Sequence, residues 1–267
     1  MKKALSALLA AVMVLGLAAV MPITAHAATL TANDETSLRT ALTNAVSGDT
    51  IRLTANITYP DFIGINGKTV TLDLNGKTLS VNNYIYLNGS AKLLLLNPDD
   101  GQFNVSCDIP EQSVAGVFGV GSKLEVTNVN YTGVANVAST AVTTYNGGEI
   151  TAYGNVTSND TGAWAGNGGK ITINGTLTVP ADNTYIKLFN GTTTAKTAAD
   201  YETNTTKEGY RTYTDGSSTV WVKIPAGGGG DGKDYFVLWG KTTTYDKALW
   251  YNWILLIFCF GWIWMAF

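Results

Sequence analysis

Histidine, cysteine and arginine are almost missing from this chain of 267 residues. The single histidine is His26, the two cysteines are Cys107 and Cys259, and charged residues make up 14% of the sequence. One imidazole close to the N-terminus excludes a histidine-based zinc site or acid–base pair in the body of the chain. Cysteines so far apart, one of them in a terminal apolar run, exclude an internal disulfide framework. A net charge of −3 with a pI near 5.1 excludes a basic nucleic-acid-binding surface.

The N-terminal segment 1–27 has the pattern of a secretory signal peptide. Two lysines after the initiator methionine, an apolar stretch over residues 4–20 and the A-x-A sequence of residues 25–27 fit a leader and its cleavage site. We expect cleavage between Ala27 and Ala28, so that the secreted chain starts at Ala28. An uncleaved N-terminal anchor is the alternative.

The C-terminal segment 248–267 is apolar and rich in aromatic side chains. At ~1.5 Å per residue, a helix of this length covers about 30 Å, enough to cross the hydrocarbon core of a bilayer. We expect a transmembrane anchor, preceded by a glycine-rich linker at 226–233 and a juxtamembrane segment at 234–247. Indole rings prefer the membrane interface, so the predicted interface residues are Trp250, Trp253, Trp262 and Trp264. A removable sorting tail and a buried helix are the alternatives.

The charges around this segment are unusual for an anchor. No basic residue follows it, whereas Lys241 and Lys247 precede it, the reverse of an ordinary stop-transfer sequence. The stretch from Tyr235 to Trp264 resembles the tails of surface proteins from Gram-positive, clostridia-like bacteria. The two ends predict a body at the extracellular face of a cell membrane, with that membrane as its partner.

Residues 33–47 form the one clear amphipathic helix of the body. Asn33 or Asp34 can cap its start, and Gly48 ends it. Apolar side chains recur on a single face at helical spacing, at Leu38, Ala41, Leu42 and Ala45. The pattern predicts a helix that packs one face against the following strands.

Downstream of the helix, short strands recur between turns that contain Asn and Gly. Turns such as Asn146-Gly147-Gly148 suit the positive φ of a sharp corner. One strand in each period of about 20–30 residues predicts the stacked coils of a solenoid, with Ile, Val and Leu inside. An antiparallel sandwich is the alternative. The strands begin near Thr69, Lys92, Lys123, Glu149 and Lys170, at spacings of 23, 31, 26 and 21 residues.

The amphipathic helix, the Gly48-Asp49-Thr50-Ile51 sequence after it and the Asn-Gly turns resemble the pectate-lyase-like superfamily. The resemblance covers residues 29–200 and implies an all-β, right-handed parallel β-helix solenoid with an N-terminal capping helix. We expect this ectodomain at 28–225, followed by the C-terminal transmembrane helix. A hairpin at 209–224, turning at Asp215-Gly216, is expected to close the far end, with Tyr213 and Trp221 as aromatic partners.

The resemblance implies the catalytic residues of the enzymes in this superfamily, and the sequence shows no recognisable set of them. Its lyases use Ca²⁺ on clustered carboxylates and an arginine base, and its hydrolases use several Asp residues and a His. Asp99-Asp100 is the only pair of adjacent Asp residues, and Pro98 before it predicts a turn. The arginines lie at the two ends of the solenoid rather than in its middle, at Arg39, Arg52 and Arg211. One alternative stays open: carboxylates on separate coils could converge as the catalytic pair of a glycosidase. The candidates are Asp73, Glu125 and Glu149.

A cofactor is not predicted. Asp108 and Glu111 flank Pro110 in a loop, and their oxygens suit Ca²⁺, but no EF-hand or Gly-Gly-x-Gly-x-Asp repeat accompanies them. The sequence therefore favours a solvated loop and a protein without catalysis, although it does not exclude an enzyme.

Aromatic residues in successive coils are the candidate ligand-binding residues. If several of them project onto one face, they form a strip on which sugar rings stack. The alternative is that each one packs over a turn or caps a layer of the core. The candidates are Tyr84, Tyr86, Tyr131, Tyr145, Tyr153 and Trp164.

The sequence as a whole favours a non-enzymatic adhesin or scaffold that contacts a polysaccharide or matrix ligand. A polysaccharide lyase or glycoside hydrolase of the same fold is one alternative, and a purely structural surface spacer is the other. The pattern of the outer face separates them, because a continuous aromatic strip indicates glycan binding and grouped carboxylates indicate catalysis. No oligomeric state is predicted.

Overall fold

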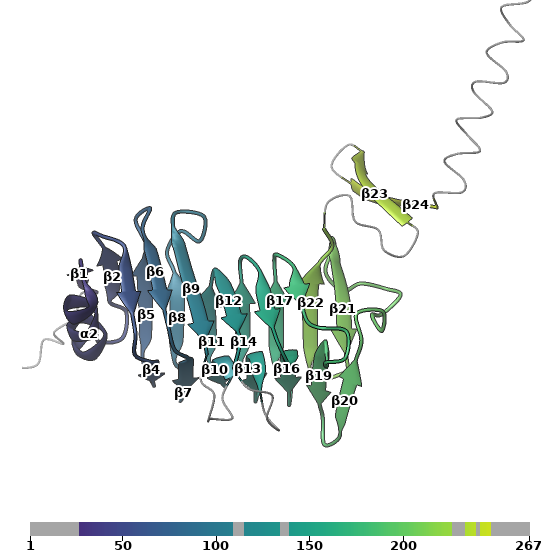
Figure 1. The fold of residues 1–267 in the computed structure, drawn as a ribbon, viewed down its shortest axis with the longest axis horizontal. Helices are drawn as coiled ribbons and strands as arrows, with labels where there is room; N and C mark the ends of the chain where they lie inside the picture. Colours follow the sequence, from purple (N-terminus) through teal and green to yellow (C-terminus); the bar gives the residue numbers. More distant parts are fainter. Residues whose placement is uncertain (1–26, 109–114, 134–138, 226–232, 239–240, 247–267) are drawn as a thin grey trace, which may run out of the picture.

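The chain folds into a parallel β-solenoid of about seven turns. Figure 1 shows the strands side by side in a long row, with the helix α2 at the N-terminal end. The computed structural model describes residues 27–108, 115–133, 139–225, 233–238 and 241–246. The predicted leader up to residue 26, most of the linker, and the segment 247–267 lie outside these ranges. The all-β solenoid predicted from the strand spacing is confirmed.

Three sheets run along the solenoid, and their strands are parallel except for the last strands of two of them. Sheet A has the order β1 (Thr29–Ala32), β2 (Thr50–Leu53), β5 (Thr69–Asp73), β8 (Lys92–Leu95), β11 (Lys123–Val126), β14 (Glu149–Ala152), β17 (Lys170–Ile173), β22 (Thr219–Lys223), β21 (Tyr210–Thr214). Sheet B contains β3 (Ile57–Tyr59), β6 (Thr78–Val81), β9 (Gln102–Cys107), β12 (Asn128–Tyr131), β15 (Val156–Ser158) and β18 (Leu177–Thr178). Sheet C contains β4 (Ile63–Asn66), β7 (Ile85–Asn88), β10 (Ala115–Val120), β13 (Thr140–Tyr145), β16 (Thr161–Gly166), β19 (Ile186–Phe189) and β20 (Thr193–Lys196). A separate antiparallel hairpin joins β23 (Lys233–Leu238) and β24 (Lys241–Asp246).

The five strand starts predicted from the sequence lie directly opposite one another in sheet A. Thr69 pairs with Lys92, Lys92 with Lys123, Lys123 with Glu149, and Glu149 with Lys170. Each predicted period is therefore one turn. The prediction of one strand per turn was wrong, because each turn also supplies strands to sheets B and C. Several of those strands are short, such as β3 with three residues, so their alternation is brief and they were not counted as separate strands.

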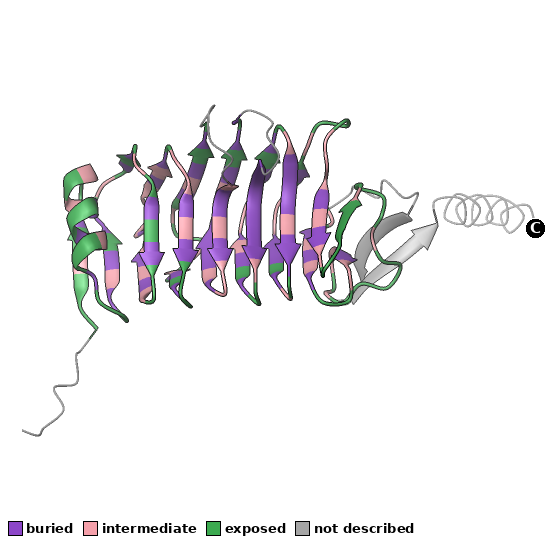
Figure 2. Cartoon of the chain, turned by 90° about the horizontal axis from the view of Figure 1, so that it is seen from below, coloured by how far each residue is buried: buried purple, intermediate pink, exposed green. Residues whose placement is uncertain are grey.

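Alternate side chains of the strands point into one apolar core. Val70 and Leu72 of β5 are buried, and Leu79 and Val81 of β6 are buried on the next face. In Figure 2 the buried residues lie along the strands, while exposed residues lie mainly at the turns and on the helix. The core therefore continues from turn to turn along the solenoid.

The Asn-Gly corners have the left-handed backbone conformation that the sequence predicted. Asn146 (φ 55°), Gly147 (φ 73°), Asn167 (φ 49°) and Gly168 (φ 80°) occupy equivalent corners on successive turns. The backbone N–H of Gly147 donates to the carbonyl of Asn167 at 3.1 Å, so that one corner stacks on the next. Most side chains are strained at these φ values, and Asn and Gly are tolerated there.

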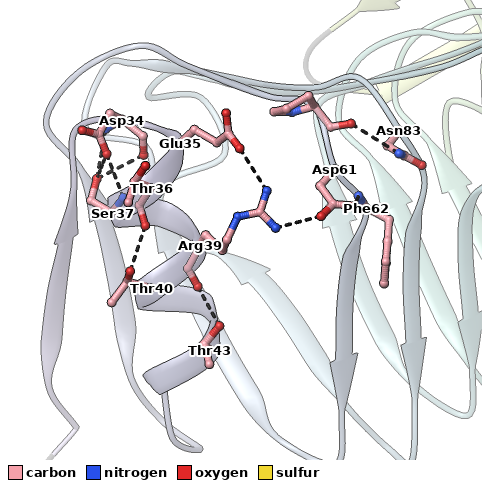
Figure 3. Close-up of polar contacts among 11 residues, drawn as sticks. Asp34, Glu35, Thr36, Ser37, Arg39, Thr40, Thr43, Asp61, Phe62 and Asn83 are labelled. Atoms are coloured by element: carbon pink, nitrogen blue, oxygen red, sulfur yellow. Dashed lines mark hydrogen bonds and ion pairs between the residues drawn. The ribbon is translucent and has the colours of Figure 1, made fainter.

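Helix α2 spans Glu35–Asn44, which is shorter than the predicted 33–47. Asp34 is its N-cap: the carboxylate of Asp34 accepts a hydrogen bond from the Ser37 N–H, and the Asp34 N–H donates to the Ser37 hydroxyl (Figure 3). These two reciprocal hydrogen bonds give partners to backbone N–H groups at the start of the helix, which have no partner within the helix. Leu38 and Ala41 of the predicted apolar face are buried.

Arg39 joins α2 to the first turn of the solenoid. Its Nη1 lies 2.7 Å from Oδ2 of Asp61, and its Nη2 lies 2.9 Å from Oε1 of Glu35 (Figure 3). The three side chains are about half exposed, and exposed ion pairs of this kind stabilise by only about 0–1 kcal/mol. Arg39 therefore orients the helix more than it stabilises the fold.

The predicted hairpin near the C-terminal end is formed by β21 and β22. The two strands are antiparallel, and β22 continues sheet A by pairing in parallel with β17. The predicted pairing of Tyr213 with Trp221 was wrong, because Tyr213 lies opposite Val220 and Trp221 lies opposite Thr212. Residues at offset register point to opposite faces of a sheet, so the Tyr213 ring is buried while the Trp221 indole faces outward.

No helix within the described ranges is long and apolar enough to cross a membrane. The segment 248–267 lies outside those ranges, so the anchor stays a prediction. The same holds for its interface residues Trp250, Trp253, Trp262 and Trp264.

The core residue Phe103 offers a test of this packing. Its ring on β9 is 0% exposed, and we expect Phe103→Ala to lower the free energy of unfolding by about 3–5 kcal/mol, because it removes buried surface and leaves a cavity. Urea unfolding followed by far-UV circular dichroism measures this change. The matched control is Leu96→Ala, at a side chain 53% exposed, which should cost less than about 0.5 kcal/mol. Equal losses in the two variants would contradict the described core.

Candidate functional site

Outward-facing side chains of sheet C form a row of aromatic rings. Tyr86 of β7, Phe118 of β10 and Trp164 of β16 share one register position, which Thr143 occupies on β13. Tyr145 lies two residues further along β13, and its ring contacts both Phe118 and Trp164. Because adjacent strands lie only about 4.8 Å apart, rings on successive turns come within reach of one another. We call Tyr86, Phe118, Tyr145 and Trp164 the aromatic row.

The four rings of the aromatic row touch in sequence. The ring centroids are 5.4 Å apart for Tyr86 and Phe118, 6.2 Å for Phe118 and Tyr145, and 5.5 Å for Tyr145 and Trp164. These distances fall within the range of favourable aromatic pairs, and the last two pairs meet edge to face. All four side chains are half-buried, so part of each ring stays open to solvent.

The absence of a side chain at Gly166 leaves the space that the Tyr145 ring occupies in the row. Gly166 lies opposite Tyr145 in register, and a Cβ at Gly166 would overlap with Cδ1 and Cε1 of the Tyr145 ring. The ring therefore lies over the bare backbone of β16, beside Trp164. A larger residue at position 166 would push it away.

A second aromatic pair lies toward the N-terminal end of the same sheet. The rings of Phe62 and Tyr84 stack with centroids 5.2 Å apart and planes 10° apart. A Cβ on Gly64, the register partner of Tyr86, would come within 3.1 Å of the Phe62 ring. Phe62 is 46% exposed, which makes it the most open ring on this side of the solenoid among those named here.

One cation lies at the C-terminal end of the aromatic row. Lys187 of β19 pairs in register with Trp164, and its Nζ lies 5.6 Å from the centroid of the indole. Burial raises the pKa of the nearby Asp160 carboxyl, and the charge of Lys187 opposes that shift. Burial also raises the pKa of the Tyr145 phenol, which therefore stays protonated and able to donate a hydrogen bond at neutral pH. The row thus combines apolar rings with a cation and a carboxyl at one end.

The structure brings together half of the predicted ligand-binding residues. Tyr86, Tyr145 and Trp164 join the aromatic row, and Tyr84 stacks on Phe62. Tyr131 is fully buried and pairs in register with buried Cys107 on the inner side of sheet B, so its prediction as a surface residue was wrong. Tyr153 is partly buried against the core.

Sequence reasoning missed Phe118, the ring that connects the row. It follows buried Val117 in β10, and this alternation is the signal that would have placed it outside. The spacing of 31 residues between Lys92 and Lys123, the longest of the four, obscured this strand in the sequence.

Sheet B presents a different outer face, which is polar and uncharged. Nδ2 of Asn128 donates to Oδ1 of Asn104 at 2.8 Å, and Oδ1 of Asn128 accepts from the Asn155 N–H at 2.8 Å. A shallow groove of about 470 Å³ runs over β6, β9, β12 and β15, lined by Ser, Thr, Val and Asn. The hydroxyl and amide groups of this groove can form hydrogen bonds to a ligand. Some of the Asn amides, however, already form hydrogen bonds within the protein.

The carboxylates of a hypothetical glycosidase pair lie on sheet A, on another face from the aromatic row. Oδ2 of Asp73 is 3.5 Å from Nε of Arg52, and Oε2 of Glu125 accepts from the Leu95 N–H at 2.9 Å. Glu149 lies in register between Lys123 and Lys170. Asp73 and Glu125 are therefore engaged by their own neighbours, and none of the three carboxylates faces the aromatic rings.

A metal site finds little support in the same ranges of the chain. Asp108 is exposed, and Glu111, its predicted partner for Ca²⁺, lies outside the described residues. Among the residues that the structure describes, no three His, Cys, Asp or Glu side chains group closely enough to hold a metal ion.

Burial raises the pKa of the Cys107 thiol to about 11, so it is a packed thiol rather than a nucleophile.

Comparisons with protein-family models, curated proteins and solved structures find no match to this chain. The parallel β-solenoid therefore stands on the structure itself. The handedness of the coil and membership of the pectate-lyase-like superfamily stay predictions from the sequence.

The position of Gly166 generates a test of the aromatic row. We expect Gly166→Ala to displace the Tyr145 ring, weaken the near-UV circular dichroism of the row and cost about 1–3 kcal/mol in the free energy of unfolding, as overpacking does. In a Tyr145→Ala background the same glycine substitution should cost much less, because the ring it strikes is gone. An unchanged near-UV spectrum in Gly166→Ala would show that the ring does not lie over position 166.

Proposed function

We propose that this chain is a secreted, membrane-anchored cell-surface protein that binds polysaccharide along the aromatic row and does not transform it. One observation carries the proposal: four half-buried rings touch in sequence across four neighbouring strands of sheet C. The predicted leader and anchor give the location, and the adhesin or scaffold role follows from a binding face displayed at a surface. The frame is a right-handed β-helix similar to the pectate-lyase-like superfamily.

The chemistry of the row fits a sugar chain. The C–H faces of sugar rings are apolar, and burying apolar surface against aromatic rings contributes about 25 cal/mol per Å². A row across four strands spans about 14 Å, which suits an oligosaccharide segment rather than one sugar. Lys187 beside Trp164 adds a charged donor at one end, and the Tyr145 hydroxyl adds a neutral one.

The enzyme alternative has weaker support in the described residues. Arg39 and Arg52 are held in ion pairs at the N-terminal end of the solenoid, and Arg211 lies over the ring of Tyr201 at the other end. The carboxylates Asp73, Glu125 and Glu149 belong to sheet A, so none of these three faces the aromatic row. A purely structural spacer would need no such row at all.

Binding is tested with variants of the row. We expect Trp164→Ala to weaken binding of a soluble polysaccharide about three- to tenfold, because one stacked aromatic contact is worth about 0.5–1.5 kcal/mol. Affinity electrophoresis of the full chain in detergent, with neutral and uronate polysaccharides in separate gels, measures the change. The matched control is Trp221→Ala, which removes a half-buried indole from sheet A and should leave binding unchanged. Equal losses in both variants, or no retardation by any polysaccharide, would contradict the proposal.

Catalysis is tested separately. Incubated with polyuronates, with and without added Ca²⁺, the full chain should produce no ultraviolet absorbance from unsaturated sugars and no new reducing ends. Product that disappears in Asp73→Asn, Glu125→Gln or Glu149→Gln would replace the adhesin with an enzyme. Binding without product is the result that the proposal expects.

A further inference from the structure

The carboxylate of Asp49 holds the backbone at the start of the solenoid. Asp49 is 3% exposed, its Oδ2 accepts from the Val46 N–H at 2.9 Å, and its Oδ1 accepts from the Ala28 N–H at 2.8 Å. The first bond closes the local turn after α2, whereas the second reaches across 21 residues to the entry of β1. These two hydrogen bonds, with a smaller effect from Lys68, hold the pKa of Asp49 below its ordinary value. The group is therefore ionised at neutral pH.

Ala28 is the residue at which the predicted leader cleavage creates a new N-terminus. Its carbonyl accepts from the Thr50 N–H at 2.8 Å, so Ala28 is already held against β2 just before β1 begins. Ala27 and Ala28 are both exposed, which leaves the bond between them at the surface. The nitrogen that cleavage converts into an α-amine thus lies in hydrogen-bond contact with an ionised carboxylate.

We infer that Asp49 is a binding site for the α-ammonium group of the processed chain, so that removal of the leader creates an ion pair at the first turn of the solenoid. The inference rests on the secretion step of the proposed function and is independent of glycan binding. A leader peptidase hydrolyses the Ala27–Ala28 peptide bond with one water molecule. Ala27 leaves with the new carboxylate, and the nitrogen of Ala28 becomes an amine that takes up a proton. The hydrogen bond to Asp49 then joins two opposite charges.

The ion pair lies at the start of β1, the strand of sheet A most prone to fraying. β1 is the edge strand of sheet A at the N-terminal end, and edge strands next to a chain end are where fraying begins. An ion pair at the residue that enters β1 fixes this strand on β2. Leader removal therefore tightens the first turn rather than only shortening the chain.

The sign of the pH dependence follows from the two charges. An opposite charge raises the pKa of an amine above the ordinary α-amino value of about 7.7–8.0, so the stabilisation is fully present below that value and is lost as pH rises through the folded pKa. The pKa of Asp49 is lowered, so at the acid end the stabilisation is lost as pH falls through that depressed value. Lys68, the other cation that acts on Asp49, donates from its Nζ to the carbonyls of Leu42 and Ala45.

A neutral anchor is the competing explanation. The Ala28 N–H donates to Asp49 whether or not residue 27 precedes it, so the hydrogen bond by itself does not require processing. The two explanations differ in the position of the positive charge. One glycine added before Ala28 keeps the hydrogen bond but moves the ammonium group about 3.8 Å along the chain.

The experiment uses the processed chain, secreted through its own leader and purified with its C-terminal segment. N-terminal sequencing should begin at Ala28. An amine-reactive reagent at pH 8 should then modify this α-amine about fivefold more slowly than the amine of the one-glycine variant, because a pKa about one unit above the ordinary value of about 8 lowers the fraction of free amine at pH 8 about fivefold. Asp49→Asn should restore the ordinary rate at Ala28. The wild-type chain should also unfold at a higher temperature than the one-glycine variant at pH 7, with the difference lost above pH 10.

The outcomes separate the explanations. A chain that begins elsewhere, or an Ala28 amine that reacts at the ordinary rate, overturns the inference. Equal melting temperatures for the wild type and the one-glycine variant at pH 7 do so as well. The one-glycine variant keeps Asp49 and the whole solenoid, so the comparison holds even if Asp49→Asn fails to fold. None of these readouts involves polysaccharide, so failure here and failure of glycan binding are distinct results.

Discussion

The parallel pairing of each turn with the next is the interaction on which the rest of this structure depends. The turns from β2 to β19 hydrogen-bond to one another through strands in sheets A, B and C, and a strand can pair only if its residues keep register. Register in turn requires that the chain bend at equivalent places. The Asn-Gly corners meet this requirement with positive φ, and their backbone hydrogen bonds pass from corner to corner. Core packing and surface rows both follow from this arrangement.

The same spacing gives each outer face its own character. Residues at one register position of successive strands lie about 4.8 Å apart, so similar side chains become rows. Sheet C carries aromatic rings, sheet B carries amides and hydroxyls, and sheet A carries ammonium and carboxylate groups. The rings come together because Gly166 leaves space over β16 for Tyr145. The aromatic row forms without a deep pocket, since the strands themselves set the intervals between its rings.

The ends of a solenoid are its exposed edges, and this chain treats them differently. At the C-terminal end, antiparallel strands β20 and β21 add to sheets C and A and interrupt the parallel pattern. At the N-terminal end, α2 buries Leu38 and Ala41, Arg39 joins it to Asp61, and Asp49 holds the entry to β1. Charged groups thus act where the regular backbone pairing runs out.

The sequence by itself determined the solenoid, its period and the position of its corners, because these depend on local alternation and on residues that tolerate positive φ. It also located the N-terminal helix and the C-terminal hairpin. Only the tertiary structure decided that each turn has three strands, that Tyr131 points inward, and that Phe118 links Tyr86 to Tyr145. The physical reason is that side-chain neighbours on a solenoid lie one turn apart, about 20–30 residues along the chain. Local patterns reveal which face of a strand a residue occupies, but the register between turns decides which residues meet.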